Sequence, residues 1–215
     1  MKKFIAFEGI DGSGKSTQLR LLSGSLKKIK ENFIITREPG GTETSEEIRK
    51  ILINDNGLKL LPNTELLLFY ASRHEHVAKV IIPNLKKRLV LCDRFFFSTF
   101  CYQIIGAGGS RNLLNYLHKN FAFNLMPDIT IVLDVDPNKA IQRSLNDKKI
   151  ETKFELKTKR FHKKVSAGFR KLSSHKKVKI INGDREIDIV HKNIIDLLNT
   201  NKFIKKKIPY YFKND

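Results

Sequence analysis

A glycine-rich segment near the start of the chain has the composition of a phosphate-binding loop. Residues 9–16 match the pattern Gly-x4-Gly-Lys-Ser/Thr, between the apolar stretch 4–7 and a helical pattern from about Lys15. Glycines let backbone N–H groups curl around phosphate oxygens, and a helix N-terminus adds partial positive charge. We expect Lys15 to reach the β- and γ-phosphates of a nucleoside triphosphate and Ser16 to ligate Mg²⁺. The residues assigned to this phosphate cradle are Gly9, Ile10, Asp11, Gly12, Ser13, Gly14, Lys15, Ser16 and Thr17.

Two further charged segments follow apolar stretches. The stretch 89–92 ends in Asp93 and Arg94. A carboxylate there would lie beside the cradle and hold Mg²⁺ directly or through water, and the planar fork of Arg94 suits a bridge between donor and acceptor phosphates. Segment 36–41, Thr-Arg-Glu-Pro-Gly-Gly, predicts a tight turn with Arg37 facing the same crevice as a clamp on the acceptor. The alternatives are a surface salt bridge for Asp93 and Arg94, and a plain turn for 36–41.

No obvious general base accompanies these residues. Phosphoryl transfer rests mainly on positioning and charge neutralisation. An acceptor that is itself a phosphate has a second pKa of about 6 and is mostly dianionic at neutral pH, so it needs no base. Two arginines, a lysine and Mg²⁺ converging on one crevice would overcome the repulsion between two anions. The pattern therefore indicates a nucleoside monophosphate kinase.

The elements that must position these residues alternate between short apolar strands and longer helices. Strands that are apolar throughout are buried on both sides, and their alternation with helices predicts an α/β fold with a parallel sheet. We expect a P-loop three-layer α/β/α architecture, in which a five-stranded parallel sheet carries helices on both faces and ligands bind at the carboxyl ends of the strands. The predicted strands are 4–7, 33–36, 88–92, 128–133 and 178–181, and the main predicted helices are 15–30, 44–53, 63–82, 97–104, 112–121 and 187–199.

The chain of 215 residues is long enough for one domain with its own core. We assign residues 1–201 to a single kinase domain. Within it, the polar and lysine-rich stretch 146–159 is either a surface linker or a short mobile lid. Residues 202–215 form a basic C-terminal tail.

The formal net charge of +19 allows two explanations. A nucleic-acid-binding protein is one, and segment 205–213 is the only stretch that mixes lysines with aromatic residues as such proteins do. The other, which we favour, combines a general lysine bias with a field that attracts polyphosphate substrates. On that view the tail is solvated, or packs its aromatic residues on the domain or a partner subunit. We expect nucleotides as ligands and do not expect nucleic acid as a partner.

Hydropathy gives no reason to expect a membrane protein or an exported one. No stretch approaches the ~20 consecutive apolar residues of a membrane-spanning helix. The apolar run at the start of the chain stops at Glu8, short of an export signal. We therefore predict a cytoplasmic protein.

Several segments together make the chain resemble the bacterial thymidylate kinases from about Lys3 to Asn199. They are residues 7–9 with the cradle, 36–41, Leu-Phe-Tyr-Ala-Ser-Arg at 68–73, Asp93-Arg94, Ser98-Thr99, Tyr102-Gln103, and Pro-Asp at 127–128 leading into 133–135. The resemblance implies transfer of the γ-phosphate of ATP to dTMP, with Mg²⁺, to give dTDP and ADP for dTTP synthesis. It also implies a homodimer. A different nucleotide or nucleoside kinase of the same fold is the closest alternative.

The resemblance also implies roles for individual residues. Phe69 would stack on the thymine ring, and Arg73 would donate to a carbonyl oxygen of the base. Tyr102 would crowd the sugar 2′ position, and Asp11 would face the sugar and phosphate of the acceptor. The edge of the base would be lined by Ser98, Thr99 and Gln103. Phe69 and Tyr102 could instead be ordinary core aromatics. The family also implies a cis peptide bond at Glu38-Pro39.

The chain departs from the family pattern in the lid. Bacterial members usually carry arginines there, whereas this chain has Lys153 in the sequence Thr-Lys-Phe-Glu. Ser13 supplies no arginine to the cradle either. Lysine is a point charge without the guanidinium fork. We therefore hypothesise that Lys153 stabilises charge in the lid, with Arg143 upstream binding ATP.

Overall fold

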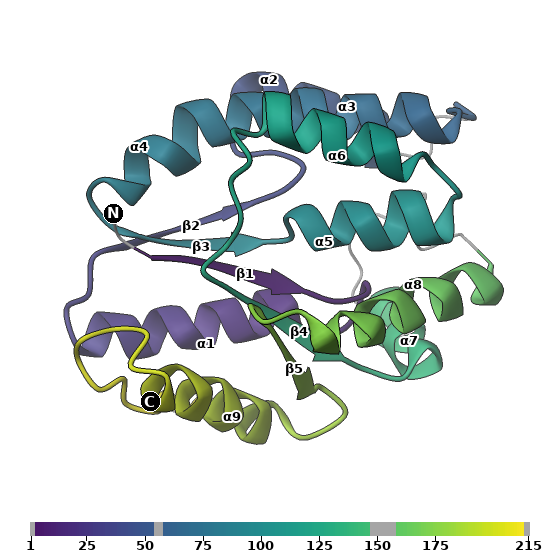
Figure 1. The fold of residues 1–215 in the computed structure, drawn as a ribbon. Helices are drawn as coiled ribbons and strands as arrows, with labels where there is room; N and C mark the ends of the chain where they lie inside the picture. Colours follow the sequence, from purple (N-terminus) through teal and green to yellow (C-terminus); the bar gives the residue numbers. More distant parts are fainter. Residues whose placement is uncertain (1–2, 54–57, 147–157, 213–215) are drawn as a thin grey trace.

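The computed structural model describes residues 3–53, 58–146 and 158–212. Its centre is a five-stranded sheet in which every neighbouring pair is parallel, in the order β2-β3-β1-β4-β5 (Figure 1). This confirms the predicted α/β fold with a parallel sheet. The strands are β1 Phe4–Glu8, β2 Phe33–Arg37, β3 Leu89–Asp93, β4 Ile129–Asp134 and β5 Val178–Asn182.

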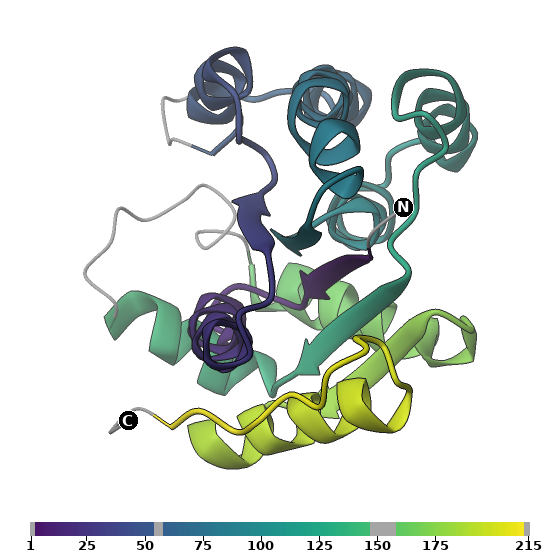
Figure 2. The same cartoon turned by 90° about the vertical axis from the view of Figure 1, so that its left-hand side faces the viewer.

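Helices cover both faces of the sheet (Figure 2). The α-helices are α1 Lys15–Lys28, α2 Glu43–Ile53, α3 Pro62–His76, α4 Ile82–Leu85, α5 Phe96–Thr99, α6 Arg111–Phe121, α7 Pro137–Asn146, α8 Lys159–Lys171 and α9 Ile187–Thr200. Two π-helical segments, η1 Val77–Ile81 and η2 Phe100–Gly106, continue α3 and α5, and η3 Leu172–Ser174 is a 3₁₀ turn. None of the described helices is both long enough and apolar enough to cross a membrane.

Strand β1 shows why the central strands are apolar throughout. Ile5 and Phe7 pack in the cluster that joins the sheet to α1 and α9. Phe4 and Ala6 pack in the opposite cluster, against η1 and α4. Because successive side chains of a strand point to opposite faces, both sets must be apolar in a three-layer fold.

The register of the strands gathers the charged residues at one end of the sheet. Phe7 pairs with Asp93 across β1 and β3, and Arg37 pairs with Asp93 across β2 and β3. The cradle follows Glu8 at the end of β1. The three charged segments identified in the sequence therefore meet where the strands end, as expected for parallel strands.

The helix after β3 differs from its predicted form. The prediction was one helix over 97–104, but the segment is α-helical only to Thr99 and π-helical to Gly106. Ile105 fills space against Gly168 of α8. An extra residue in a π-turn is a common way to aim side chains at a site. The Glu38-Pro39 bond is cis, as predicted.

The described part of the tail, residues 202–212, lies along the domain beside α1 and α9 (Figures 1 and 2). Ile208 is 2% exposed, and its backbone N–H and C=O both bond to the side chain of Asn199. The Tyr211 ring lies so close to Gly24 that a Cβ there would meet it at 2.5 Å. Packing on the domain, one of the alternatives left open by the sequence, is observed for Ile208 and Tyr211. Most of the proposed lid, including Lys153, lies outside the described residues.

Candidate active site

Three glycines of the cradle have backbone conformations that other residues rarely adopt. Their φ angles are 137° at Gly9, 72° at Gly12 and 91° at Gly14. A Cβ at Gly12 would meet the backbone oxygen of Ala140 at 2.0 Å, whereas a Cβ at Gly14 would meet nothing within 4 Å. Gly12 therefore closes the loop against α7, and Gly14 leaves the start of α1 open to a ligand.

Lys15 is folded back on its own loop. Its Nζ donates to the backbone oxygens of Gly9 at 3.1 Å and Ile10 at 2.8 Å. Burial, followed by the charge of Arg94, lowers the pKa of Lys15 to about 8. These two carbonyl oxygens hold the ammonium inside the cradle.

Ser16 and Asp93 form an oxygen pair suited to Mg²⁺. Ser16 Oγ donates to Asp93 Oδ2 at 3.0 Å. The other carboxylate oxygen, Asp93 Oδ1, is buried and has no hydrogen-bond partner among the described residues. Hard oxygen ligands beside bound phosphates are what Mg²⁺ prefers. The two residues therefore fit the cation assigned to them from the sequence.

Arg94 joins the cradle to the neighbouring cleft. Its backbone has a φ of 69°, which aims the side chain back across the crevice. Nη1 donates to Gly9 O at 3.0 Å and to Ser98 Oγ at 3.1 Å, and Nη2 donates to Asp11 Oδ1 at 2.5 Å. The hydroxyl of Tyr102 donates to Asp11 Oδ2 at 2.9 Å. Burial raises the pKa of Asp11, but Arg94 and Lys15 outweigh it and hold that pKa below its ordinary value.

A cleft opens on the far side of Arg94. It brings together eight of the nine residues that the sequence assigned to the acceptor, and the exception is Arg37. Its lining residues are Asp11, Glu38, Pro39, Arg49, Ile53, Phe69, Arg73, Arg94, Phe95, Ser98, Thr99, Tyr102 and Gln103.

Arg73 is held rigidly in the wall of this cleft. Its Nε donates to Glu38 Oε2 at 2.7 Å, and its Nη2 donates to Thr99 Oγ1 at 2.9 Å. The guanidinium lies 4.8 Å and 4.9 Å from the ring centres of Tyr70 and Phe95. Its Nη1 is buried without a hydrogen-bond partner among the residues described. A ligand carbonyl is the kind of acceptor that this donor lacks.

Arg37 does not face this cleft. Its Nη2 donates to both oxygens of Glu46 at 3.1 Å and 2.9 Å, and its side chain is 54% exposed. It lines a neighbouring groove together with Ser16 and Asp93. Glu46 lies in the first turns of α2, so it draws the guanidinium of Arg37 away from the acceptor cleft.

Arg49 takes the position expected of Arg37. It lines the cleft from α2, and its Nη1 donates to Pro39 O at 2.8 Å. Burial and the nearby charges of Arg37 and Arg94 lower the pKa of Arg49. Arg49 and Arg94 both line the cleft, and a bound anion would reduce the repulsion between their charges. No sequence motif marks Arg49, because a single arginine on an amphipathic helix resembles any surface residue.

Glu8 is a second residue that sequence reasoning passed over. It is fully buried and accepts hydrogen bonds from Phe95 N at 2.9 Å, from Ser98 N at 3.0 Å and from the Ser98 hydroxyl. Burial is the largest influence on its pKa, which is raised to about 7. Glu8 thus holds the two residues that position Arg94. These are Phe95, the next residue along the chain, and Ser98, to which the Arg94 guanidinium donates. The available signal was a carboxylate inside an otherwise apolar strand.

Arg143 lies on α7, apart from the acceptor cleft. Its Nη1 is 3.4 Å from Gly183 O, and its Nη2 is 3.8 Å from Asp184 Oδ1. Within the cradle, Ile10 and Ser13 are buried, and Thr17 is half-buried on the first turn of α1. In the acceptor cleft, Gln103 Nε2 donates to Glu65 Oε2 at 3.3 Å.

Comparison with known proteins identifies the family to which the chain is similar. The family model described as thymidylate kinase matches residues 7–194. Curated thymidylate kinases from Kosmotoga olearia and Wolbachia pipientis are each 40% identical, and the alignments cover 89% and 93% of this chain and 93% and 97% of theirs. A crystal structure of thymidylate kinase from Ehrlichia chaffeensis is similar with a TM-score of 0.73 and 36% identity, over 92% of this chain and 98% of that one.

Proposed function

The chain belongs to the thymidylate kinase family, and from that premise we propose which of its residues carry out each part of the reaction. The enzyme transfers the γ-phosphate of ATP to dTMP, giving dTDP and ADP, and uses Mg²⁺. The single observation that best supports our assignment is the position of Arg94. It bonds to the cradle at Gly9 and to the wall of the acceptor cleft at Asp11 and Ser98, which supports a position between the two bound nucleotides.

On the donor side, the backbone N–H groups of the cradle bind the ATP phosphates, and Lys15 leaves Gly9 and Ile10 to contact the β- and γ-phosphates. Ser16 and Asp93 would hold Mg²⁺, which supplies charge neutralisation on those phosphates when bound. Arg143 binds ATP from α7, and Lys153, which lies outside the described residues, stabilises charge during the transfer. Arg37 adds positive charge beside Asp93, and would have to leave Glu46 to touch the transferred phosphate.

On the acceptor side, Arg94 and Arg49 bind the dTMP phosphate from two directions, and Asp11 fixes the guanidinium of Arg94. Phe69 stacks on the thymine ring. The Nη1 of Arg73, which has no hydrogen-bond partner in the described part of the chain, donates to a base carbonyl. Tyr102 lies against the sugar. The edge of the base contacts Ser98, Thr99 and Gln103.

A coupled assay of ADP formation tests these assignments. We expect turnover with dTMP well above that with dUMP, UMP, dCMP, AMP or GMP, because the cleft combines a rigid arginine donor with an aromatic wall. Arg73→Lys should reduce the preference for dTMP over dCMP, since lysine cannot keep the bonds to Glu38 and Thr99 while still donating to the base. Equal preference in the variant and the parent would contradict the role given to Arg73.

Replacing Arg49 by lysine should raise the KM for dTMP about tenfold, because the fork that binds the acceptor phosphate is lost. We expect the KM for ATP to change little, since Arg49 lies outside the cradle. Steady-state kinetics with each substrate varied in turn measures both constants. Its exposed neighbour on the same helix supplies the control, Lys50→Arg. A larger effect on ATP than on dTMP would place Arg49 on the donor side instead.

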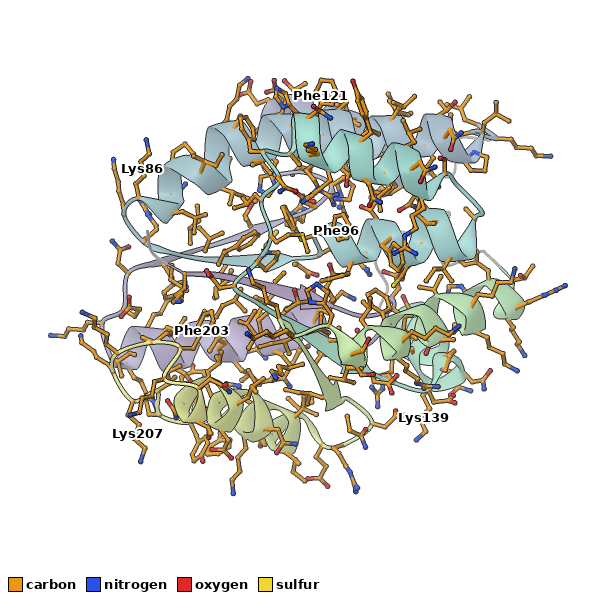
Figure 3. All side chains as sticks on the ribbon, in the orientation of Figure 1. Lys86, Phe96, Phe121, Lys139, Phe203 and Lys207 are labelled. Atoms are coloured by element: carbon orange, nitrogen blue, oxygen red, sulfur yellow. The ribbon has the colours of Figure 1, made fainter. Side chains whose placement is uncertain are left out.

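We further propose that the enzyme is a homodimer in the cytoplasm, joined through α3 and α6. Leu67 and Tyr116 are 48% and 59% exposed on these helices, and Phe121 and Phe123 beside them are 44% and 53% exposed. The ring of Tyr116 is 6.4 Å from that of Phe121, and the ring of His74 stacks on that of Phe123 at 5.7 Å. Figure 3 labels Phe121 at this outer surface. A contiguous apolar patch of this kind is typical of an interface between copies.

Substituting Leu67→Glu and Tyr116→Glu together should convert the dimer to a monomer, because each change would bury unpaired charges at the interface. Light scattering coupled to size-exclusion chromatography gives the mass directly. The matched control is the same pair of charges on α9, Ile187→Glu and Ile189→Glu, where the parent side chains are 50% and 45% exposed. A parent protein that elutes as a monomer would disprove the proposed dimer.

A further inference from the structure

The end of the molecule opposite the catalytic crevice is strongly basic. It is formed by residues 27–32 at the end of α1 and just after it, 86–88 after α4, and 202–207 after α9 (Figure 1). These segments contain ten lysines and arginines and a single acidic residue, Glu31. Figure 3 labels Lys86, Phe203 and Lys207 at this end of the molecule. We call these three segments, with Lys3, the basic end.

Bonds between the segments show that they form one surface. Lys206 Nζ donates to Ile29 O at 2.8 Å, which joins the tail to the end of α1. The Nζ of Lys3 lies 5.4 Å from the ring centre of Phe203. Leu89 N donates to Asn32 O, and Val90 N donates to Lys3 O, so the entries to β1, β2 and β3 are adjacent. Four parts of the sequence that are far apart thus place their cations side by side.

Such a concentration of like charge is costly unless an anion covers it. The contacts between the segments place these exposed charges on one surface, and like charges within about 8 Å of one another are not fully screened at physiological salt. The nucleotide substrates do not use this surface, because the cradle and the acceptor cleft lie at the other end of the strands. A ligand of the basic end would therefore be an anion other than the substrates.

The apolar residues of segment 203–208 are turned inward, which argues against insertion of this segment into a lipid surface. Ile208 is buried, and Phe203 and Ile204 pack against the main core cluster. Insertion into a bilayer requires exposed apolar side chains, whereas purely electrostatic binding to anionic lipid does not and is tested below with vesicles. The side chains directed outward from 202–207 are lysines.

Aromatic residues next to the basic end favour a partner that has bases. Tyr210 and Phe212 are 38% and 36% exposed, and their ring centres lie 6.1 Å apart. Lys192 lies 5.9 Å from the ring centre of Tyr210, and Lys28 lies 5.2 Å from that of Tyr211. Cations along a backbone path with aromatic rings beside them are the two features with which proteins bind single strands without sequence preference.

We propose that the basic end binds single-stranded nucleic acid, with lysines of 27–30, 86–88 and 202–207 on the phosphates and the rings of Tyr210 and Phe212 against the bases. The ligand is a polyanion read by charge and stacking and not by sequence. This binding is separate from the kinase reaction and does not depend on the residues assigned to it.

Fluorescence anisotropy with a labelled oligodeoxyadenylate of about twenty nucleotides tests the proposal. Adenine bases, together with saturating dTMP, keep the acceptor cleft from capturing the probe. We expect binding at low salt that weakens steeply as salt rises, with a logarithmic slope of about −4 if about six phosphates are contacted. An absence of binding at low salt would overturn the proposal.

A matched pair of variants separates a defined surface from net charge alone. The first carries Lys86→Glu, Lys87→Glu, Lys205→Glu and Lys207→Glu at the basic end, and should bind at least about tenfold more weakly. The control carries Lys163→Glu, Lys164→Glu, Lys171→Glu and Lys179→Glu, all exposed and elsewhere. It changes the net charge equally and should bind within about twofold of the parent. Equal losses in both variants would overturn the proposal.

Two further readouts distinguish the proposed ligand and exclude misfolding. Turnover of dTMP should be unchanged in both variants, because none of the eight lysines lies in the catalytic machinery. Tyr210→Ala with Phe212→Ala should weaken binding of the oligonucleotide but not of inorganic polyphosphate, which has no bases. Anionic phospholipid vesicles that bind the protein more tightly than the oligonucleotide would overturn the proposal in favour of a membrane surface.

Discussion

Replacing Arg94 by lysine is expected to lower kcat by about 10²- to 10³-fold, the range measured when a single transition-state donor is removed. The parent guanidinium uses two nitrogens at once, on Ser98 and Gly9 from one side and on Asp11 from the other. A lysine has one nitrogen and cannot span both nucleotides. The backbone at position 94 would keep its φ of 69°, so the loss of activity would come from the changed side chain and not from a changed turn.

Single-turnover kinetics with both nucleotides saturating measures this effect apart from binding. We expect the KM for ATP to change by less than about threefold, because the cradle and Lys15 remain. Arg88→Lys at the opposite end of β3 serves as the control and should have parent activity. A kcat within about fivefold of the parent for Arg94→Lys would contradict a bridging role for Arg94.

The second large effect is expected for Glu8→Gln, which should make the protein more stable and less active. Burial raises the pKa of Glu8 from 4.5 to about 7. The folded protein therefore binds this proton more tightly than the unfolded chain does. The stability associated with the protonated carboxyl is fully present below about pH 4.5 and is lost as the pH rises through about 7. At about pH 8 the buried charge costs about 3 kcal/mol of unfolding free energy.

Glutamine avoids that cost because it is neutral, and its oxygen can still accept from Phe95 N and Ser98 N. Urea unfolding should show the variant more stable by about 3 kcal/mol at about pH 8, with a difference that shrinks toward about pH 5. Turnover should fall about tenfold, because the anion that orients the Ser98 hydroxyl toward Arg94 is gone. The exposed Glu47→Gln is the control and should change neither property. A variant less stable than the parent at about pH 8 would contradict the assigned cost.

Local patterns in the sequence were sufficient to predict the sheet and the cradle. Five apolar stretches predicted the five parallel strands. The central strands β1, β3 and β4 are apolar because they are buried on both faces, whereas the edge strands β2 and β5 are partly exposed. The glycines and Lys15 were predictable because a phosphate loop of this kind needs those residue types at a fixed spacing. The acceptor cleft was recognised only through the family resemblance, since nothing in a run such as 68–73 shows by itself which side chains face a ligand.

Other features depend on contacts between distant segments and could not be predicted from local pattern. Arg37 ends a strand beside Asp93, yet Glu46 on the next helix holds it outside the cleft. Arg49 enters the cleft because α2 packs across the turn at Pro39, a tertiary arrangement. Glu8 is buried because the turn after β3 supplies three donors from residues about ninety positions away. The position of each of these three side chains depends on a contact between distant segments, which the spacing of residues in the sequence does not reveal.

The contact between the tail and α1 has a consequence for synthesis of the chain on the ribosome. Lys206 and Ile29 bond across 177 residues of sequence, and Ile208 completes the core against Leu22 and Leu26. Helix α1, which follows the phosphate cradle, therefore leaves the ribosome early, but its apolar side has no packing partner in α9 and the tail until these have been translated. At roughly 5–20 residues per second this interval lasts on the order of ten seconds or more. During that time the apolar side of α1 is exposed to chaperones and to other nascent chains, and stable folding of the kinase is delayed until after translation of its tail.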